Sequence, residues 1–210
     1  MNKKIGISTA IGTATVAIIV GAVFTLNLPT EQKSEFSDVY AKLNSELKKI
    51  LAENNILLSS PLRLSEKESI SKYCTFFGEE EKQSLVDYCT STELKDSEGK
   101  FLGNIHMVGD ITNPKLILAI IQVDPLMSQL VDLKKVYGVA IEYLVCDCWQ
   151  EQNPDGFETI SDWIDAMKKF HTSDVKPHSR SKVITLEDNK LQLELSTNQD
   201  GYLWKLLIER

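Results

Sequence analysis

An uncharged stretch of 24 residues, from Ile5 to Leu28, constrains this chain more than any other feature of its sequence. As a helix with a rise of about 1.5 Å per residue, it would span about 36 Å, which exceeds the roughly 30 Å hydrocarbon core of a bilayer. Lys3 and Lys4 precede it, and basic residues favour the cytoplasmic side of a membrane. The pattern predicts a single-pass transmembrane anchor, with residues 1–4 as a cytoplasmic tail and the remaining chain on the extracytoplasmic side.

A cleaved signal peptide is the alternative interpretation of the same stretch. Such a peptide needs an apolar region of about 7–15 residues that ends in small side chains at the cleavage site. The apolar region here is longer, and its end from Val23 to Leu28 has bulky residues where small ones are needed. We therefore expect an uncleaved signal-anchor. Cleavage would instead give a secreted protein, and both interpretations place the domain outside the cytoplasm.

The remainder of the chain is acidic. A polar linker, residues 29–35, leads to a domain, residues 36–210, of a size that one hydrophobic core supports. Lys3 and Lys4 are the only charged side chains before Glu31, so the later chain holds all 30 acidic residues against 21 basic ones. An acidic surface repels phosphate backbones, which argues against a nucleic-acid-binding protein.

Apolar side chains at helical spacing predict helices over residues 36–54, 65–77, 79–89, 124–149 and 157–170. Ser65 and Glu68 have the spacing of a capping box at the start of the second of these helices. In the fourth, Gly138 is a candidate kink, and part of Val139 to Val145 is equally compatible with a strand.

Period-two patterns and continuous apolar runs predict strands over residues 100–108, 115–123, 182–186, 190–196 and 202–209, with residues 171–182 as a polar loop. Short turns separate the last three strands, which therefore form an antiparallel meander. Helices first and mostly hairpin-linked strands later are typical of the α+β class. We expect a transmembrane helix followed by helices packed on an antiparallel sheet with a C-terminal β-meander.

Four cysteines, Cys74, Cys89, Cys146 and Cys148, are disulfide candidates, because an even number in an extracytoplasmic domain indicates disulfides. Four cysteines allow three pairings. A Cys74–Cys89 bond would join the second and third predicted helices, and closing a loop of that size stabilises a fold by about 3 kcal/mol. Two cross-bridges from Cys74 and Cys89 to Cys146 and Cys148 are the alternative.

The Cys146-Asp147-Cys148 segment also suggests a soft-metal site, for copper or zinc. Two thiolates at positions i and i+2 share one face in a strand but point in opposite directions in a helix. Chelation therefore requires an extended segment or a frayed helix end. His171 and His178 are the side chains that we expect to complete such a site.

The motifs of the common catalytic and cofactor-binding classes are missing from the sequence, which favours a non-enzymatic function. On the predicted topology the cytoplasmic tail would be too short to hold an effector domain. We therefore expect a binding or interaction module of an envelope complex, tethered in membrane lipid through residues 5–28 and acting on a protein partner. Two alternatives are a thiol-redox or soft-metal-handling protein using Cys146 and Cys148, and a hydrolase whose catalytic residues are scattered along the chain.

Overall fold

Antiparallel strands form one sheet in the computed structural model, which describes residues 38–75, 80–84, 86–173 and 176–210. The strands are β1 (Leu57–Leu58), β2 (Leu62–Leu64), β3 (Tyr88–Lys95), β4 (Phe101–Gly109), β5 (Pro114–Val123), β6 (His178–Arg180), β7 (Ile184–Leu186), β8 (Asn189–Asn198) and β9 (Gly201–Glu209). Their order in the sheet is β1-β3-β4-β5-β9-β8-β6, while β2 pairs with β3 and β7 pairs with β8. The C-terminal meander is therefore confirmed, and its last strand joins the earlier strands through β5.

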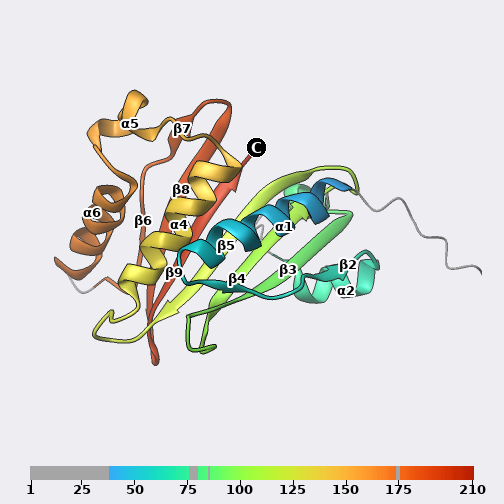
Figure 1. Cartoon of the computed structure of the whole chain (residues 1–210), viewed down its shortest axis with the longest axis horizontal. Coiled ribbons are helices and arrows are strands. Elements are labelled where there is room, and N and C mark those ends of the chain that lie inside the picture. The colour runs from blue at the N-terminus through green and yellow to red at the C-terminus, as the bar shows by residue number, and fades with distance from the viewer. Residues whose placement is uncertain (1–37, 76–79, 85, 174–175) are drawn as a thin grey trace, which may run out of the picture. The chain divides into compact units, whose positions relative to one another are not determined.

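The helices are α1 (Asp38–Glu53), α2 (Lys67–Tyr73), α3 (Glu80–Ser84), α4 (Leu130–Leu144), α5 (Trp149–Gln152) and α6 (Ile160–Ser173). Helices α1 and α4 lie over the same face of the sheet, and α6 lies beside β6 at one end of it (Figure 1). The apolar faces of α4 and α6 are buried in a core shared with the central strands. The prediction of an α+β fold is confirmed.

Strands β5 and β9 together form the central part of the core with one face of the pair. Ile117, Ala119 and Ile121 of β5 alternate along the strand and are all buried. Their partners across the ladder are Ile208, Leu206 and Trp204 of β9, which are buried as well. Side chains two positions apart share one face of a strand, so these cross-strand pairs present a continuous apolar surface to the helices.

The helix predicted over residues 79–89 is confirmed only for Glu80–Ser84, which form α3, because strand β3 begins at Tyr88. Tyr88, Thr90 and Thr92 begin a run of β-branched and aromatic residues, which pack well on a pleated surface and lose rotamer freedom in a helix. The predicted capping box is also wrong, because α2 begins after Glu66 and no side chain caps it. The acidic residues of this segment resemble a helix start, whereas pairing with β4 determines the strand.

Two further predictions are corrected at the chain segments between the main elements. The loop predicted over residues 171–182 contains the end of α6 and the strand β6. The strand considered within residues 139–145 is not formed, since α4 continues through Gly138 to Leu144. Strands β1 and β2, which flank Pro61, are short, and isolated pairs of two or three residues leave almost no periodic signal.

The predicted membrane anchor, cytoplasmic tail and linker, residues 1–35, lie outside the residues that the structure describes. Across the described ranges, no helix has both the length and the apolar character that crossing a bilayer requires.

Candidate thiol site

The Cys146-Asp147-Cys148 segment connects α4 to α5 and is not helical. The N–H groups of Val145 and Cys146 both donate to the carbonyl of Ile141, which ends α4. Cys148 then stands at the first position before α5. Both sulfurs can lie close together only if this segment is outside a regular helix, and the structure fulfils that requirement. Cys146 and Cys148 form a disulfide across a single intervening residue.

Two polar side chains from distant parts of the chain meet at this disulfide. The Gln152 side-chain amide donates to Cys148 Sγ over 3.3 Å and to a Glu187 carboxylate oxygen over 2.8 Å. Gln152 lies one helical turn beyond Cys148, whereas Glu187 comes from the turn between β7 and β8. The Gln152 amide thus links the sulfur of Cys148 to a carboxylate that lies 35 positions beyond Gln152.

Glu187 is held in an unusual backbone conformation, with φ of 50°. Glycine, asparagine and aspartate tolerate this left-handed region better than a long side chain does, and the conformation costs about 1–2 kcal/mol. Strain of this kind persists where the surroundings determine the backbone, and it is concentrated at functional sites. Here the strained residue carries the carboxylate that faces the disulfide.

The two disulfides of this protein differ in their exposure. Cys146 and Cys148 are half-buried and pack against the main core. Cys74 and Cys89, in contrast, are completely buried and join the end of α2 to β3. The predicted Cys74–Cys89 bond is confirmed, although Cys89 lies in a strand, and the alternative of two cross-bridges is wrong.

One group of potential metal ligands is found among the described residues, and it consists of Cys146, Cys148 and Glu187. Their ligand atoms all lie within 4.8 Å of one another. The group includes neither of the histidines that the sequence proposed as partners. Two thiolates and one carboxylate are a ligand set that zinc accepts, with a fourth position left for water or substrate, but both sulfurs are free to bind a metal only when the disulfide is reduced.

His171 and His178 have other partners. His171 is buried, and its two ring nitrogens lie 2.8 Å from the hydroxyls of Ser179 and Thr197. Burial lowers the pKa of His171, and the neighbouring His178 and Lys176 lower it further. His178 is exposed and hydrogen-bonds Ser196. His171 therefore ties α6 to strands β6 and β8, and neither histidine belongs to the group of potential metal ligands found among the described residues.

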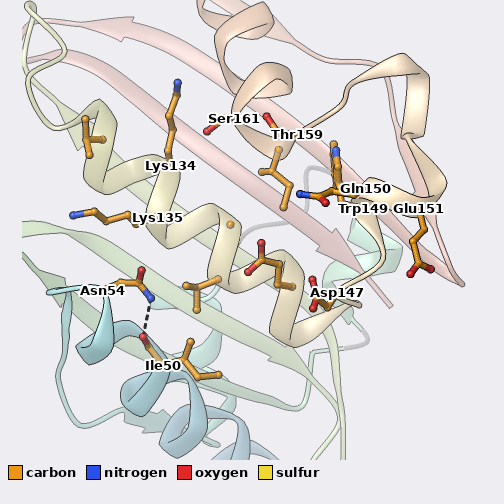
Figure 2. Close-up of a pocket in the computed structure, with 15 residues that line it drawn as sticks. Ile50, Asn54, Lys134, Lys135, Asp147, Trp149, Gln150, Glu151, Thr159 and Ser161 are labelled. Atoms are coloured by element: carbon orange, nitrogen blue, oxygen red, sulfur yellow. Dashed lines mark hydrogen bonds between the residues drawn. The ribbon is translucent and has the colours of Figure 1, made fainter.

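A wide groove of about 760 Å³ adjoins the thiol segment. Figure 2 shows Asp147 and Trp149, which flank Cys148, on one side of the groove, with Lys134 and Lys135 of α4 further along it. Burial raises the pKa of Glu142 in this groove, and the nearby Asp147 carboxylate raises it further. The disulfide thus lies next to a surface hollow with both acidic and basic side chains.

The sequence identified Cys146 and Cys148 but missed Gln152 and Glu187. Gln152 lies four positions after Cys148, so a helix starting at Cys148 would have brought the two together. Nothing in the sequence connects Glu187 to this segment, since its position depends on how the β7–β8 turn docks.

No family model, curated protein or solved structure matches this chain.

Proposed function

We propose that this protein is a thiol–disulfide exchange protein whose redox centre is the Cys146–Cys148 pair. The observation that carries the proposal is a half-buried disulfide across one residue, with a hydrogen-bond donor on one sulfur and a carboxylate beside it. The uncharged segment 5–28 and the preceding Lys3 and Lys4 support a membrane-tethered domain on the extracytoplasmic side. That compartment is one in which disulfides persist.

The size of the loop that it closes argues against a purely structural bond. By the chain-entropy relation, closing the short Cys146–Cys148 loop stabilises the fold by about 1.5 kcal/mol, against about 3 kcal/mol for the Cys74–Cys89 loop. A bond that contributes so little to stability, and that solvent can reach, is suited to being opened and closed during function.

The exchange reaction uses a protein dithiol as the substrate. A substrate thiolate attacks Cys146 Sγ, the bond between the two cysteine sulfurs breaks, and Cys148 leaves with the electron pair as a thiolate. The second substrate thiolate then attacks the substrate sulfur of the mixed disulfide and releases Cys146. The substrate loses two electrons and two protons, which the cysteine pair gains. A low-molecular-weight disulfide reoxidises the pair and is reduced to two thiols.

Gln152 and Glu187 give the two sulfurs different roles. The amide N–H that contacts Cys148 Sγ stabilises negative charge on that sulfur, which makes Cys148 the better leaving group. The Glu187 carboxylate has the opposite effect on a thiolate, because like charges repel at short range. It therefore holds the reduced pair in the thiol form and limits unproductive reaction.

Oxidation of a fluorescent two-cysteine peptide by the full chain in detergent micelles tests the proposal. We expect stoichiometric oxidation by the wild type, and none beyond background by the double variant Cys146→Ala, Cys148→Ala. When the single variants are incubated instead with the oxidised peptide, the Cys146 thiolate of Cys148→Ala should attack the peptide disulfide and form a mixed disulfide, with one peptide thiolate as the leaving group, whereas Cys146→Ala should form much less. All three variants keep the Cys74–Cys89 bond, which serves as the internal control. Equal peptide oxidation by the wild type and the double variant would overturn the proposal.

Metal handling is a second candidate function, favoured by the approach of Cys146, Cys148 and Glu187 within 4.8 Å of one another. Elemental analysis of the reduced protein after incubation with zinc, and separately with copper(I), distinguishes it from thiol exchange. One equivalent of metal that is lost in Glu187→Ala, together with absent peptide oxidation, would establish metal handling in place of the redox function.

A further inference from the structure

Strand β6 forms an edge of the sheet with one side unpaired among the described strands. Its pairing with β8 places Thr197 N–H on the Pro177 carbonyl and Ser181 N–H on the Leu193 carbonyl. Hydrogen bonding in an antiparallel pair alternates along a strand, so the residues between these positions direct their main-chain groups the other way. The N–H and C=O groups of His178 and Arg180 therefore point to the outer edge.

An apolar groove runs beside this edge. It has a volume of about 470 Å³, and its floor contains Phe157, Trp163 and Met167, while Arg180 and Lys182 line the side formed by β6 and the segment after it. Phe170 of α6 also lines the groove and is 50% exposed. The groove thus joins the outer edge of β6 to a half-exposed aromatic side chain.

The charged side chains that line this groove are basic on balance, with Arg180 and Lys182 against Asp155. Residues 168–182 hold five basic side chains against one acidic one, in a chain with a net charge of −7. Lys182 is exposed, and the Lys176 ammonium lies 3.6 Å from the centre of the Phe170 ring. Arg180 is exposed and pairs with Glu194 of β8 over 2.5 Å. A local basic surface of this kind attracts an acidic partner.

We propose that the β6 edge and this groove bind an extended acidic segment of a partner protein as an added strand. Main-chain hydrogen bonds to His178 and Arg180 would hold the segment, alternate bulky apolar side chains would enter the groove against Trp163 and Phe170, and acidic side chains would face Arg180 and Lys182. The same cations repel the basic β6 edge of a second copy, so the surface selects against self-pairing. This interaction extends beyond the thiol function and requires neither Cys146 nor Cys148.

Binding of a labelled eight-residue peptide that alternates glutamate with phenylalanine or leucine tests the proposal, using the full chain in detergent micelles. We expect the contribution of main-chain hydrogen bonds to appear as a difference in peptide affinity between His178→Pro and its matched control His178→Ala. Both variants lose the same side chain, but the proline also lacks the outward N–H group, which edge strands tolerate. The proline variant should bind about fivefold or more weakly than the alanine variant. Equal affinities would overturn strand addition.

Two exposed positions test the charge and the groove without relying on the edge strand. Lys182→Glu and Phe170→Ala should each weaken peptide binding about tenfold, and the Lys182 effect should shrink at high salt. Thermal melts of every variant check folding. The Cys146→Ala, Cys148→Ala variant should bind the peptide as the wild type does, whatever its redox activity.

Three outcomes would contradict the acidic-peptide partner. A lysine-for-glutamate version of the peptide that binds equally well would remove the charge argument. A chain dimer that His178→Pro abolishes would identify a second copy as the occupant. Binding to anionic phosphatidylserine vesicles that Lys182→Glu abolishes and His178→Pro leaves unchanged, with no peptide binding, would identify a lipid surface instead.

Discussion

The two disulfides of this protein occupy contrasting environments. Cys74 and Cys89 are buried in a small apolar cluster with Ile70, Val86 and Val108, and their bond joins residues 15 positions apart. Cys146 and Cys148 are half-buried, two positions apart, and adjoin Gln152 and Glu187. The Cys74–Cys89 bond closes the longer loop and lies inside an apolar cluster. The Cys146–Cys148 bond closes a very short loop and lies beside polar groups. On the proposed redox function, exposure and loop length, more than the presence of a disulfide, distinguish a bond that exchanges with substrate from a structural one.

Reaction with a reductant should separate the two bonds most strongly. We expect low concentrations of a phosphine reductant to open Cys146–Cys148 about 100-fold faster than Cys74–Cys89, because reaction requires access to a sulfur. Alkylation followed by peptide mass spectrometry at successive times measures both rates in one sample. Opening of both bonds at the same rate would end the distinction.

Removing the Cys74–Cys89 bond by mutation should lower the free energy of unfolding more than removing the Cys146–Cys148 bond. The double variant Cys74→Ala, Cys89→Ala should lose about 3 kcal/mol of unfolding free energy or more, since the buried cluster also loses packing. The matched variant Cys146→Ala, Cys148→Ala should lose about 1.5 kcal/mol or less. Urea unfolding monitored by circular dichroism gives both values, and a larger loss for the second variant would contradict the assignment of roles.

Acid should weaken the region of the buried disulfide. His106 of β4 pairs in register with Ser91 of β3, the strand that carries Cys89, and burial lowers the pKa of His106 to about 4. Because the unfolded chain protonates near pH 6.5 and the folded chain does not, this contribution is complete above pH 6.5 and is lost as the pH falls toward 4. The loss amounts to at most about 3 kcal/mol. Urea midpoints at pH 7 and pH 4.5 should differ less in His106→Leu than in the wild type, and an unchanged difference would refute the cause.

Backbone strain at the thiol site should give the smallest effect. Glu187→Gly removes the cost of a positive φ and should raise the unfolding free energy by about 1 kcal/mol, whereas Glu187→Ala keeps the strain and should not. Both variants lose the carboxylate, so both should react faster with alkylating agents once reduced. Thermal melts combined with alkylation rates separate stability from reactivity. Equal stabilities for the two variants would show that the turn is unstrained.

Elements with strong local patterns were predictable. The apolar spacing before Glu53 predicted α1, and the continuous Leu/Ile run of β5 was recognised as a strand, because each pattern repeats over several turns or residues. Strand β3 was not predicted, and its first two residues were assigned to the preceding helix, since the acidic residues before it resemble a helix start and only pairing with β4 identifies the strand. Short edge strands such as β6 offer too few residues for a period to be detected.

The amino-acid sequence by itself determined the α+β class, the C-terminal meander, the candidate Cys74–Cys89 bond and the candidate site at Cys146 and Cys148. Local periodicity, spacing and residue type are sufficient to predict these features. Tertiary structure alone decided that β9 would join β5, that Glu187 would face the Cys146–Cys148 pair, and that His171 would hydrogen-bond Ser179 and Thr197. Such contacts join residues far apart along the chain, and their geometry depends on how whole elements dock, for which a linear pattern holds no signal.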